Sequence, residues 1–190
     1  MFTNILDITN LQLWEKKLDL SSSFDLTKTD FEIEPVDQKT CREMAAQNNW
    51  QANFTTTIDE ILDYSDICFI AKADGKMVHW THITFKSAYI AEINKRIQPN
   101  SDSAYLYGIF TAKDFRKKGI ASAVIEKVAD YLTEKGIKKL QVIVDSHNNS
   151  MAKIVNKTGF EQIGAVKLVK IGKLKLYRYK GRTKEFLTSK

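Results

Sequence analysis

The segment from residue 104 to residue 145 constrains the fold most, because it passes from strand-like to helix-like and back to strand-like patterning. AYLYGIFT (104–111) and KLQVIVD (139–145) are rich in the β-branched and aromatic residues that favour strands. Between them, apolar residues at helical spacing predict one buried face of a helix that ends at Gly136: Ile120, Val124, Ile125, Val128, Ala129 and Leu132. This order predicts a right-handed parallel crossover.

Outside this crossover, the sequence predicts shorter elements. Residues 66–85 contain two strand-like runs joined by Asp74-Gly75, a pair that tolerates positive φ and predicts an antiparallel hairpin. The other expected elements are a strand at 31–35, a helix from Asp37 to about Asn48, a short helix at 58–64, a helix that follows SHNNS and reaches about Thr158, and strands at 165–171 and 173–179. We therefore expect an α/β fold with a mixed sheet.

The length of 190 residues fits one domain. A polar stretch at 18–30, with SSS and LTKTD, predicts a loop. Residues 1–30 are therefore expected to form an appended N-terminal arm, and residues 31–190 a single compact domain.

Composition indicates a soluble, cytoplasmic protein. No apolar run is close to the length of a membrane span, about 20 residues. The N-terminal residues lack the pattern of a secretory leader. Cys41 and Cys68 are too few for a disulfide framework and lack the close spacing of a zinc site. We expect two buried thiols in a reducing interior, and no metal.

The two parts of the chain carry opposite charge. Residues 1–112 have a net charge of −6, whereas residues 113–190 have a net charge of +12. The basic part suits an anionic partner: nucleic acid, a membrane surface or a phosphorylated ligand, although a solvated lysine-rich face is an equal alternative.

A basic, glycine-containing stretch, FRKKGIASAV (115–124), leads into the predicted helix of the crossover. The first turn of a helix has unpaired backbone N–H groups and a partial positive charge, so an anion is stabilised there. Gly119 and the small Ala121 allow close approach of the backbone, and three cations add charge: Arg116, Lys117 and Lys118. A Walker loop is excluded because its motif is absent.

The spacing Arg-x-x-Gly-x-Ala in this stretch resembles the pyrophosphate loop of the GNAT N-acetyltransferase superfamily. A second signature of that family, an Asn followed by a short helix and Lys-x-Gly-Phe, is matched by Asn148, Lys157, Gly159 and Phe160. The resemblance covers roughly residues 30–165. It implies a mixed, mostly antiparallel sheet, flanked by helices, with a V-shaped splay between two central parallel strands.

The resemblance also implies acetyl-CoA as co-substrate and assigns the residues that would bind it. Backbone groups of Ile109, Phe110 and Thr111 would pair with the acyl and pantetheine amides. Asn148 would contact the pantetheine arm. The pyrophosphate would lie on backbone amides of the loop, with Arg116 in support: Lys117, Lys118, Gly119, Ile120, Ala121 and Ser122.

The chain departs from the family pattern at the catalytic positions. The usual proton-donating Tyr of the short helix is replaced by Val155, and the two usual Glu positions are Ile143 and Tyr105. Tyr105 and Tyr107, which share one strand face, are the replacements we assign, although both residue types are common in packing. The remaining candidates are His82 and a route through water with unassisted thiolate expulsion. His79 and His82 are expected on opposite strand faces, which excludes a metal pair.

We therefore expect acetyl transfer to a primary amine of a small molecule, with an amino sugar favoured, and no nucleic-acid or membrane partner, in a monomer or homodimer. A protein N-terminal or lysine acetyltransferase is an alternative, because the first half is rich in acidic residues: Glu32, Glu34, Asp59, Glu60, Asp63 and Asp66. A non-catalytic acyl-CoA-binding domain is another, because the usual Tyr and Glu are missing. A nucleic-acid module would rest only on the basic tail.

Overall fold

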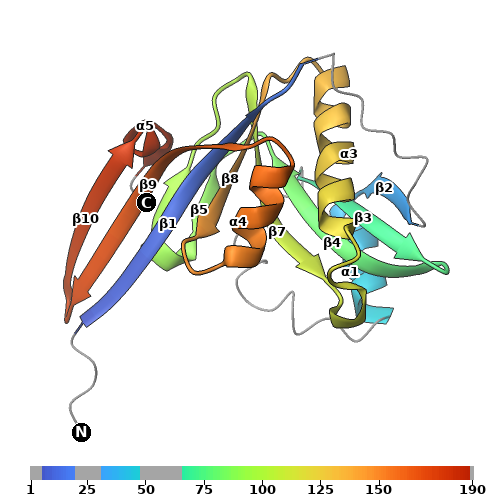
Figure 1. The fold of residues 1–190 in the computed structure, drawn as a ribbon, viewed down its shortest axis with the longest axis horizontal. Helices are drawn as coiled ribbons and strands as arrows, with labels where there is room; N and C mark the ends of the chain where they lie inside the picture. The colour runs from blue at the N-terminus through green and yellow to red at the C-terminus, as the bar shows by residue number, and fades with distance from the viewer. Residues whose placement is uncertain (1–5, 20–30, 48–65, 189–190) are drawn as a thin grey trace, which may run out of the picture.

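The computed structural model describes residues 6–19, 31–47 and 66–188 (Figure 1). The strands are β1 (Leu6–Lys17), β2 (Glu32–Val36), β3 (Ile67–Ala73), β4 (Lys76–Thr84), β5 (Ala88–Ile90), β6 (Lys95–Ile97), β7 (Ser103–Thr111), β8 (Lys139–Asp145), β9 (Glu161–Ile171), β10 (Leu174–Gly181) and β11 (Leu187–Thr188). The helices are α1 (Gln38–Gln47), α3 (Ile120–Glu134), α4 (Asn149–Lys157) and α5 (Thr183–Phe186), with short 3₁₀ turns η3 (Ala91–Ile93) and η4 (Lys113–Phe115). Among these helices, none is long and apolar enough to cross a membrane.

Eight strands form the main sheet in the order β10-β9-β1-β8-β7-β4-β3-β2, and β11, β6 and β5 form a small second sheet. All neighbours in the main sheet are antiparallel except β7 and β8. The helix α3 connects these two parallel strands, as the crossover pattern predicts. The expected α/β fold with a mostly antiparallel sheet is therefore confirmed.

The two parallel strands diverge after a short paired stretch. Their ladder runs from Ser103 opposite Lys139 to Leu106 opposite Val142, and the remainder of β7 has no partner on β8. Beyond Leu106, β7 stays paired with β4 on its outer side. The expected V-shaped splay is confirmed, and it exposes inner backbone edges of both strands.

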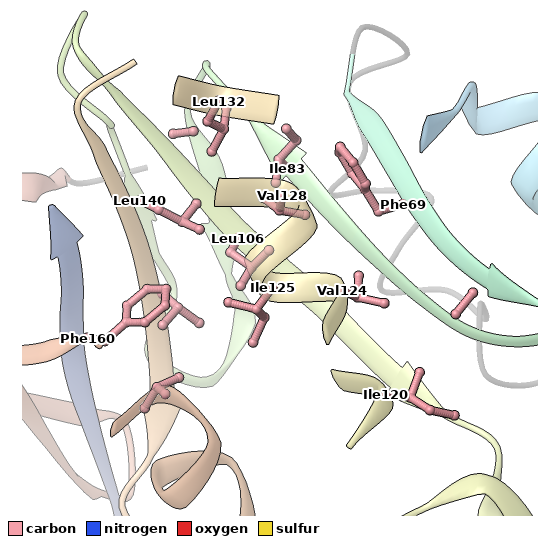
Figure 2. Packing of buried hydrophobic residues seen from close by; sticks show 14 of the residues in the cluster. Phe69, Ile83, Leu106, Ile120, Val124, Ile125, Val128, Leu132, Leu140 and Phe160 are labelled. Carbon is pink, nitrogen blue, oxygen red and sulfur yellow. The ribbon is translucent and has the colours of Figure 1, made fainter. Parts of the chain in front are cut away.

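The largest core cluster holds α3 against one face of the sheet (Figure 2). The helix contributes five of the six apolar positions that its periodicity predicts, including Val128 and Leu132, and the sixth, Ala129, is also buried. The other members of this cluster come from β3, β4, β7, β8, α4 and the residue before β9, and include Phe69, Ile83, Leu106, Leu140 and Phe160. Burial of this helix therefore fixes where its first turn lies relative to the splayed strands.

The opposite face of the sheet is covered in two places. Next to β3 and β4, α1 packs Cys41 and Ala45 against a cluster that contains Ile70 and Trp80. Next to β1, β7 and β9, the small sheet and α5 form another cluster, which includes Tyr105. Successive residues of these strands therefore pack into hydrophobic clusters on opposite faces of the sheet, as strand geometry requires.

The first strand corrects one expectation. Residues 6–17 were expected in an appended arm, but β1 is inserted between β8 and β9 and pairs with both. Leu13 is fully buried there, and Glu15 and Lys16 are also buried. Glu15 accepts a hydrogen bond from Gln141 at 2.8 Å, and Lys16 pairs with Glu126 at 2.6 Å. These long-range partners allow charged residues in an interior strand.

Local turn and cap predictions agree with the structure where it describes them. Asp74 and Gly75 both have positive φ, 50° and 73°, and join β3 to β4 as an antiparallel hairpin. The Asp37 carboxylate accepts a hydrogen bond from the Thr40 backbone N–H at 2.7 Å, before the expected helix. The expected loop at 20–30 and helix at 58–64 lie outside the described residues.

Truncation of Leu132 tests the central packing. We expect Leu132→Ala to lower the free energy of unfolding by about 2–5 kcal/mol, because it leaves a cavity between α3 and the sheet. The matched control is Leu176→Ala, since Leu176 is half exposed on β10 and should change stability by less than about 0.5 kcal/mol. Chemical denaturation measures both, and equal effects would contradict this account of the core.

Candidate functional site

A cavity of about 390 Å³ lies at the splay between β7 and β8. Its walls come from residues 105–109 of β7, residues 142–145 of β8, the segment 89–92 around η3, and Asn148 and Met151 at the start of α4. The volume falls within the range of small-molecule sites. The divergence of the parallel strands therefore produces a ligand-sized opening with exposed backbone along one wall.

An irregularity in β7 lies on this wall. Between Tyr107 and Phe110, two residues, Gly108 and Ile109, face the single residue Thr81 of β4. Such a bulge leaves backbone groups outside the regular ladder, and β8 offers no partner at this level. Gly108 adopts φ of 60°, and a Cβ there would lie 2.8 Å from Nδ1 of His82, so a side chain would disturb the bulge.

The predicted pyrophosphate loop forms an open helix start. Gly119 is the N-cap of α3 with φ of 81° and makes no side-chain cap bond. Lys117, Lys118 and Gly119 are exposed, and the Lys118 ammonium lies 4.8 Å from the Phe115 ring centre. The Arg116 side chain donates to the Thr111 carbonyl oxygen at 3.1 Å. The backbone amides of the first turn are therefore available to an anion, with cations beside them.

Asn148 lies at the cavity and caps the next helix. Its side-chain oxygen accepts a hydrogen bond from the Met151 backbone N–H at 3.0 Å. Of the predicted strand residues, Ile109 lines the cavity as well. Phe110 stacks on Trp80 with ring centres 4.1 Å apart, and Thr111 contacts His79 at 2.7 Å. Asn148 and Ile109 thus meet at the cavity, whereas the side chains of Phe110 and Thr111 pack against β4.

Both candidate tyrosines line the cavity and stack on each other, with ring centres 5.9 Å apart. Burial, with a smaller contribution from the charge of Glu92, raises the pKa of Tyr105 well above its ordinary value. Burial and the hydrogen bond to Asp66 raise the pKa of Tyr107 still further. The hydroxyl of Tyr107 donates to Asp66 Oδ2 at 2.5 Å. Both tyrosines are therefore protonated at neutral pH.

The histidines have separate surroundings. His79 pairs across the sheet with Ala71, and His82 pairs with Cys68, so the two rings lie on opposite faces as expected. Burial lowers the pKa of each to about 3, so both are neutral at pH 7. His82 stacks on Tyr107 with ring centres 5.4 Å apart and therefore lies behind the cavity wall.

Two carboxylates near the tyrosines have roles that the sequence did not assign. Asp66 precedes β3 and is buried against Tyr107, 41 residues away along the chain. Glu92 lies in η3 on the cavity rim. The sequence placed Asp66 only within a broad acidic surface and gave no signal for Glu92, because the contacts of both depend on how separate strands come together.

The chain matches the Acetyltransferase (GNAT) family over residues 25–160. This match spans more than half of the chain and includes β7, the loop, α3, β8 and α4. The protein therefore belongs to the Acetyltransferase (GNAT) family.

Individual relatives agree with this family. The chain is 28% identical over 105 residues to aminoglycoside N(6')-acetyltransferase type 1 of Salmonella typhimurium, which covers 55% of this chain and 69% of that protein. It is also 28% identical over 99 residues to an uncharacterised N-acetyltransferase of Methanocaldococcus jannaschii, covering 52% of this chain but only 41% of the archaeal protein.

A solved structure supports the fold. A GNAT-family acetyltransferase of Novosphingobium aromaticivorans superposes with a TM-score of 0.58 at 15% identity, covering 86% of this chain and 64% of that chain. At this level of identity, the likeness concerns the fold alone.

A charge reversal beside the loop tests whether this helix start binds the co-substrate. We expect Lys118→Glu to weaken acetyl-CoA binding about tenfold, because it replaces an attractive charge by a repulsive one beside the pyrophosphate. Lys173→Glu, in the exposed turn between β9 and β10, makes the same change in net charge and is the matched control. Calorimetric titration gives both Kd values, and equal weakening would contradict a local site.

Proposed function

We propose that this protein transfers the acetyl group of acetyl-CoA to a primary amine of an amino sugar. The observation that carries the proposal is the cavity at the β7–β8 splay, whose lining includes the carboxylates of Glu92 and Asp145, together with the open start of α3 that follows β7. The family supports acetyl-CoA as donor, and the aminoglycoside-modifying relative supports an amino sugar as acceptor.

The donor would lie along the inner edge of β7. The pyrophosphate accepts hydrogen bonds from backbone amides of residues 117–122, where the helix start favours negative charge. The pantetheine arm pairs with the backbone of residues 109–111, which has no partner on β8. Asn148 uses its side-chain oxygen to cap α4, so its amide N–H group is the part that contacts the arm.

The bulge places backbone groups at the inner end of this path. A carbonyl oxygen that develops negative charge during attack is stabilised by backbone N–H groups already fixed in position. Gly108 and Ile109 lie at the cavity outside the β8 ladder. We assign their backbone N–H groups to bind the oxygen of the acetyl carbonyl.

The acceptor would enter beside η3. An amino sugar carries ammonium groups at neutral pH, and Glu92 provides a carboxylate on the rim to attract them. Tyr89, Tyr105 and Tyr107 also line the cavity, and the tyrosine side chain, with its hydroxyl group, suits a polyhydroxylated ligand.

The ammonium group must first lose one proton to solvent to become a nucleophile, and the attacking nitrogen must lose a second proton as the amide forms. Tyr107 is the group we assign to this step: its oxygen accepts a proton from the attacking amine while its own proton passes to Asp66. Attack forms the new C–N bond, and collapse of the tetrahedral intermediate breaks the C–S bond and releases CoA thiolate. Asp66 acts through Tyr107 and is a positioning residue.

The assay that tests the function measures release of free thiol from acetyl-CoA with a panel of amines. We expect turnover with amino sugars and aminoglycosides, and at least tenfold lower kcat/KM with peptides that carry a free N-terminus or a lysine. Preference for a peptide would support a protein acetyltransferase instead. Binding of acetyl-CoA without any turnover would support a non-catalytic domain.

Removal of one hydroxyl tests the assigned proton route. We expect Tyr107→Phe to lower kcat by about 10²-fold with little change in KM for acetyl-CoA, because the donor path does not involve this hydroxyl. Asp66→Asn should lower kcat less and change its pH profile. Tyr179→Phe, in β10, is the matched control. Unchanged turnover in Tyr107→Phe would exclude this route.

Neutralisation of the rim carboxylate tests the acceptor subsite. We expect Glu92→Gln to raise KM for a polycationic aminoglycoside about tenfold and to leave KM for acetyl-CoA unchanged. The effect should shrink at high salt, because the attraction is screened at the exposed rim. An equal rise in both KM values would point to a change in structure rather than lost attraction.

A further inference from the structure

Two cysteine side chains meet beneath α1 although they lie 27 residues apart in the chain. Cys41 belongs to α1 and Cys68 to β3, and neither has exposed surface. Their Sγ atoms are 2.6 Å apart. These are the two cysteines of the whole sequence, so each has one intramolecular partner available.

This contact is close for unlinked thiols. Ordinary N–H···O hydrogen bonds are about 2.7–3.2 Å long, and sulfur is a larger atom than either nitrogen or oxygen. A sulfur pair at 2.6 Å can reach an ordinary distance in three ways. It contracts to a covalent bond of about 2.05 Å, it separates around an ion that bonds to both atoms, or the two free thiols move apart and stay reduced.

A metal ion is the competing interpretation, because a nitrogen of His82 lies within 4.8 Å of both sulfur atoms. Zinc bonds each thiolate sulfur at about 2.3 Å in tetrahedral geometry, which would push the two sulfur atoms well apart. The covalent bond needs a shift of only about half an ångström. The geometry favours the bond.

We propose that Cys41 and Cys68 form an intramolecular disulfide that fastens α1 to β3. The proposal is independent of the acetyl-transfer function. It also departs from the sequence-based expectation of two buried thiols, because the cysteines come together only through the packing of α1 on the sheet.

The covalent step is an exchange with a low-molecular-weight disulfide such as oxidised glutathione. One cysteine thiolate attacks a reagent sulfur, forms a mixed disulfide and releases one reagent thiol. The second cysteine attacks the mixed disulfide, forms the protein S–S bond and releases the second reagent thiol. Two electrons pass to the reagent, and the two cysteine protons remain with the released thiols.

The reagent reaches the two buried cysteines when α1 opens locally. Within the described residues, α1 buries Gln38, Cys41 and Ala45 and packs Met44 against the same cluster, so a small contact holds it to the sheet. Elements with few buried contacts open locally at low free-energy cost. In the closed state, burial and the neighbouring thiol raise the pKa of Cys68 well above its ordinary value, which slows the reaction until α1 opens.

The bond would stabilise the segment next to the cavity. Gln38 donates from Nε2 to the Asp66 carbonyl oxygen at 3.3 Å, and Asp66 precedes Cys68 by two residues. A disulfide between α1 and β3 would therefore tether both segments that make this contact, the one that contains Gln38 and the one that contains Asp66. Closing a loop of this length also removes conformational freedom from the unfolded chain.

The test compares the fully reduced full-length chain with the same chain equilibrated against oxidised glutathione. We expect the non-reduced oxidised protein to be lighter by two hydrogen atoms, without glutathione adducts, and to resist alkylation after denaturation. Peptide mapping should link the segments around Cys41 and Cys68. We also expect oxidation to raise Tm by about 5 °C or more, reversibly with reductant.

The variants Cys41→Ser and Cys68→Ser are the matched controls, since each retains one thiol. Their Tm should not rise with oxidant, and each should gain a glutathione adduct or form a chain-to-chain dimer on denaturation. If a variant fails to fold, mass and Tm of the wild-type chain still decide the question.

Three outcomes would overturn the proposal: two glutathione adducts on one chain, two free thiols after equilibration, or a bound metal. Elemental analysis of the reduced, tag-free protein identifies the metal. Loss of that metal in His82→Gln, but not in His79→Gln on the opposite face, would establish the three-donor metal site instead.

Discussion

The divergence of β7 from β8 is the constraint on which the site depends. Each strand continues past the end of their common ladder because its other edge is paired: β7 with β4, and β8 with β1 up to Asp145 opposite Leu11. Two rows of inner backbone groups can therefore remain open at low cost, since the outer ladders hold the strands. A cavity between the two strands follows from this divergence without any special side chain.

The same packing that stabilises the protein also sets where the open start of α3 lies. The apolar side of α3 is fully buried against the sheet, so the position of its first turn is set by the core and not by the loop. The connection from Thr111 to Gly119 is short and contains only the η4 turn. The helix start must therefore lie near the open end of β7, where a ligand that runs along the strand arrives.

Local patterns allowed much of this to be predicted. The crossover, the Asp74-Gly75 hairpin and the start of α3 depend on residues close together in sequence. Pairing between residues far apart in the sequence could not be predicted from such local patterns. The place of β1 in the sheet depends on Asn10 and its neighbours meeting both β8 and β9, and a short LQLW alternation beside a polar stretch does not reveal that. The contact of Asp66 with Tyr107 has the same origin, because it crosses between strands that are not adjacent in sequence.

Because Val155 replaces the family's proton-donating Tyr, any proton transfer must use side chains that non-local contacts bring to the cavity. The family resemblance assigns a proton-donating Tyr to this position of α4, but Val155 is fully buried in the α3 core and offers no polar group. The polar side chains in the cavity lining therefore come from other elements and include Tyr105 and Tyr107 of β7, Glu92 of η3 and Asp145 of β8. Tyr107 is already hydrogen-bonded to a carboxylate, which directs its proton away from the departing sulfur and toward Asp66. This arrangement favours help in deprotonating the amine over protonation of the leaving group. A departing thiolate needs a proton less than an alkoxide or an amide ion does, because the pKa of a thiol is only about 8.5.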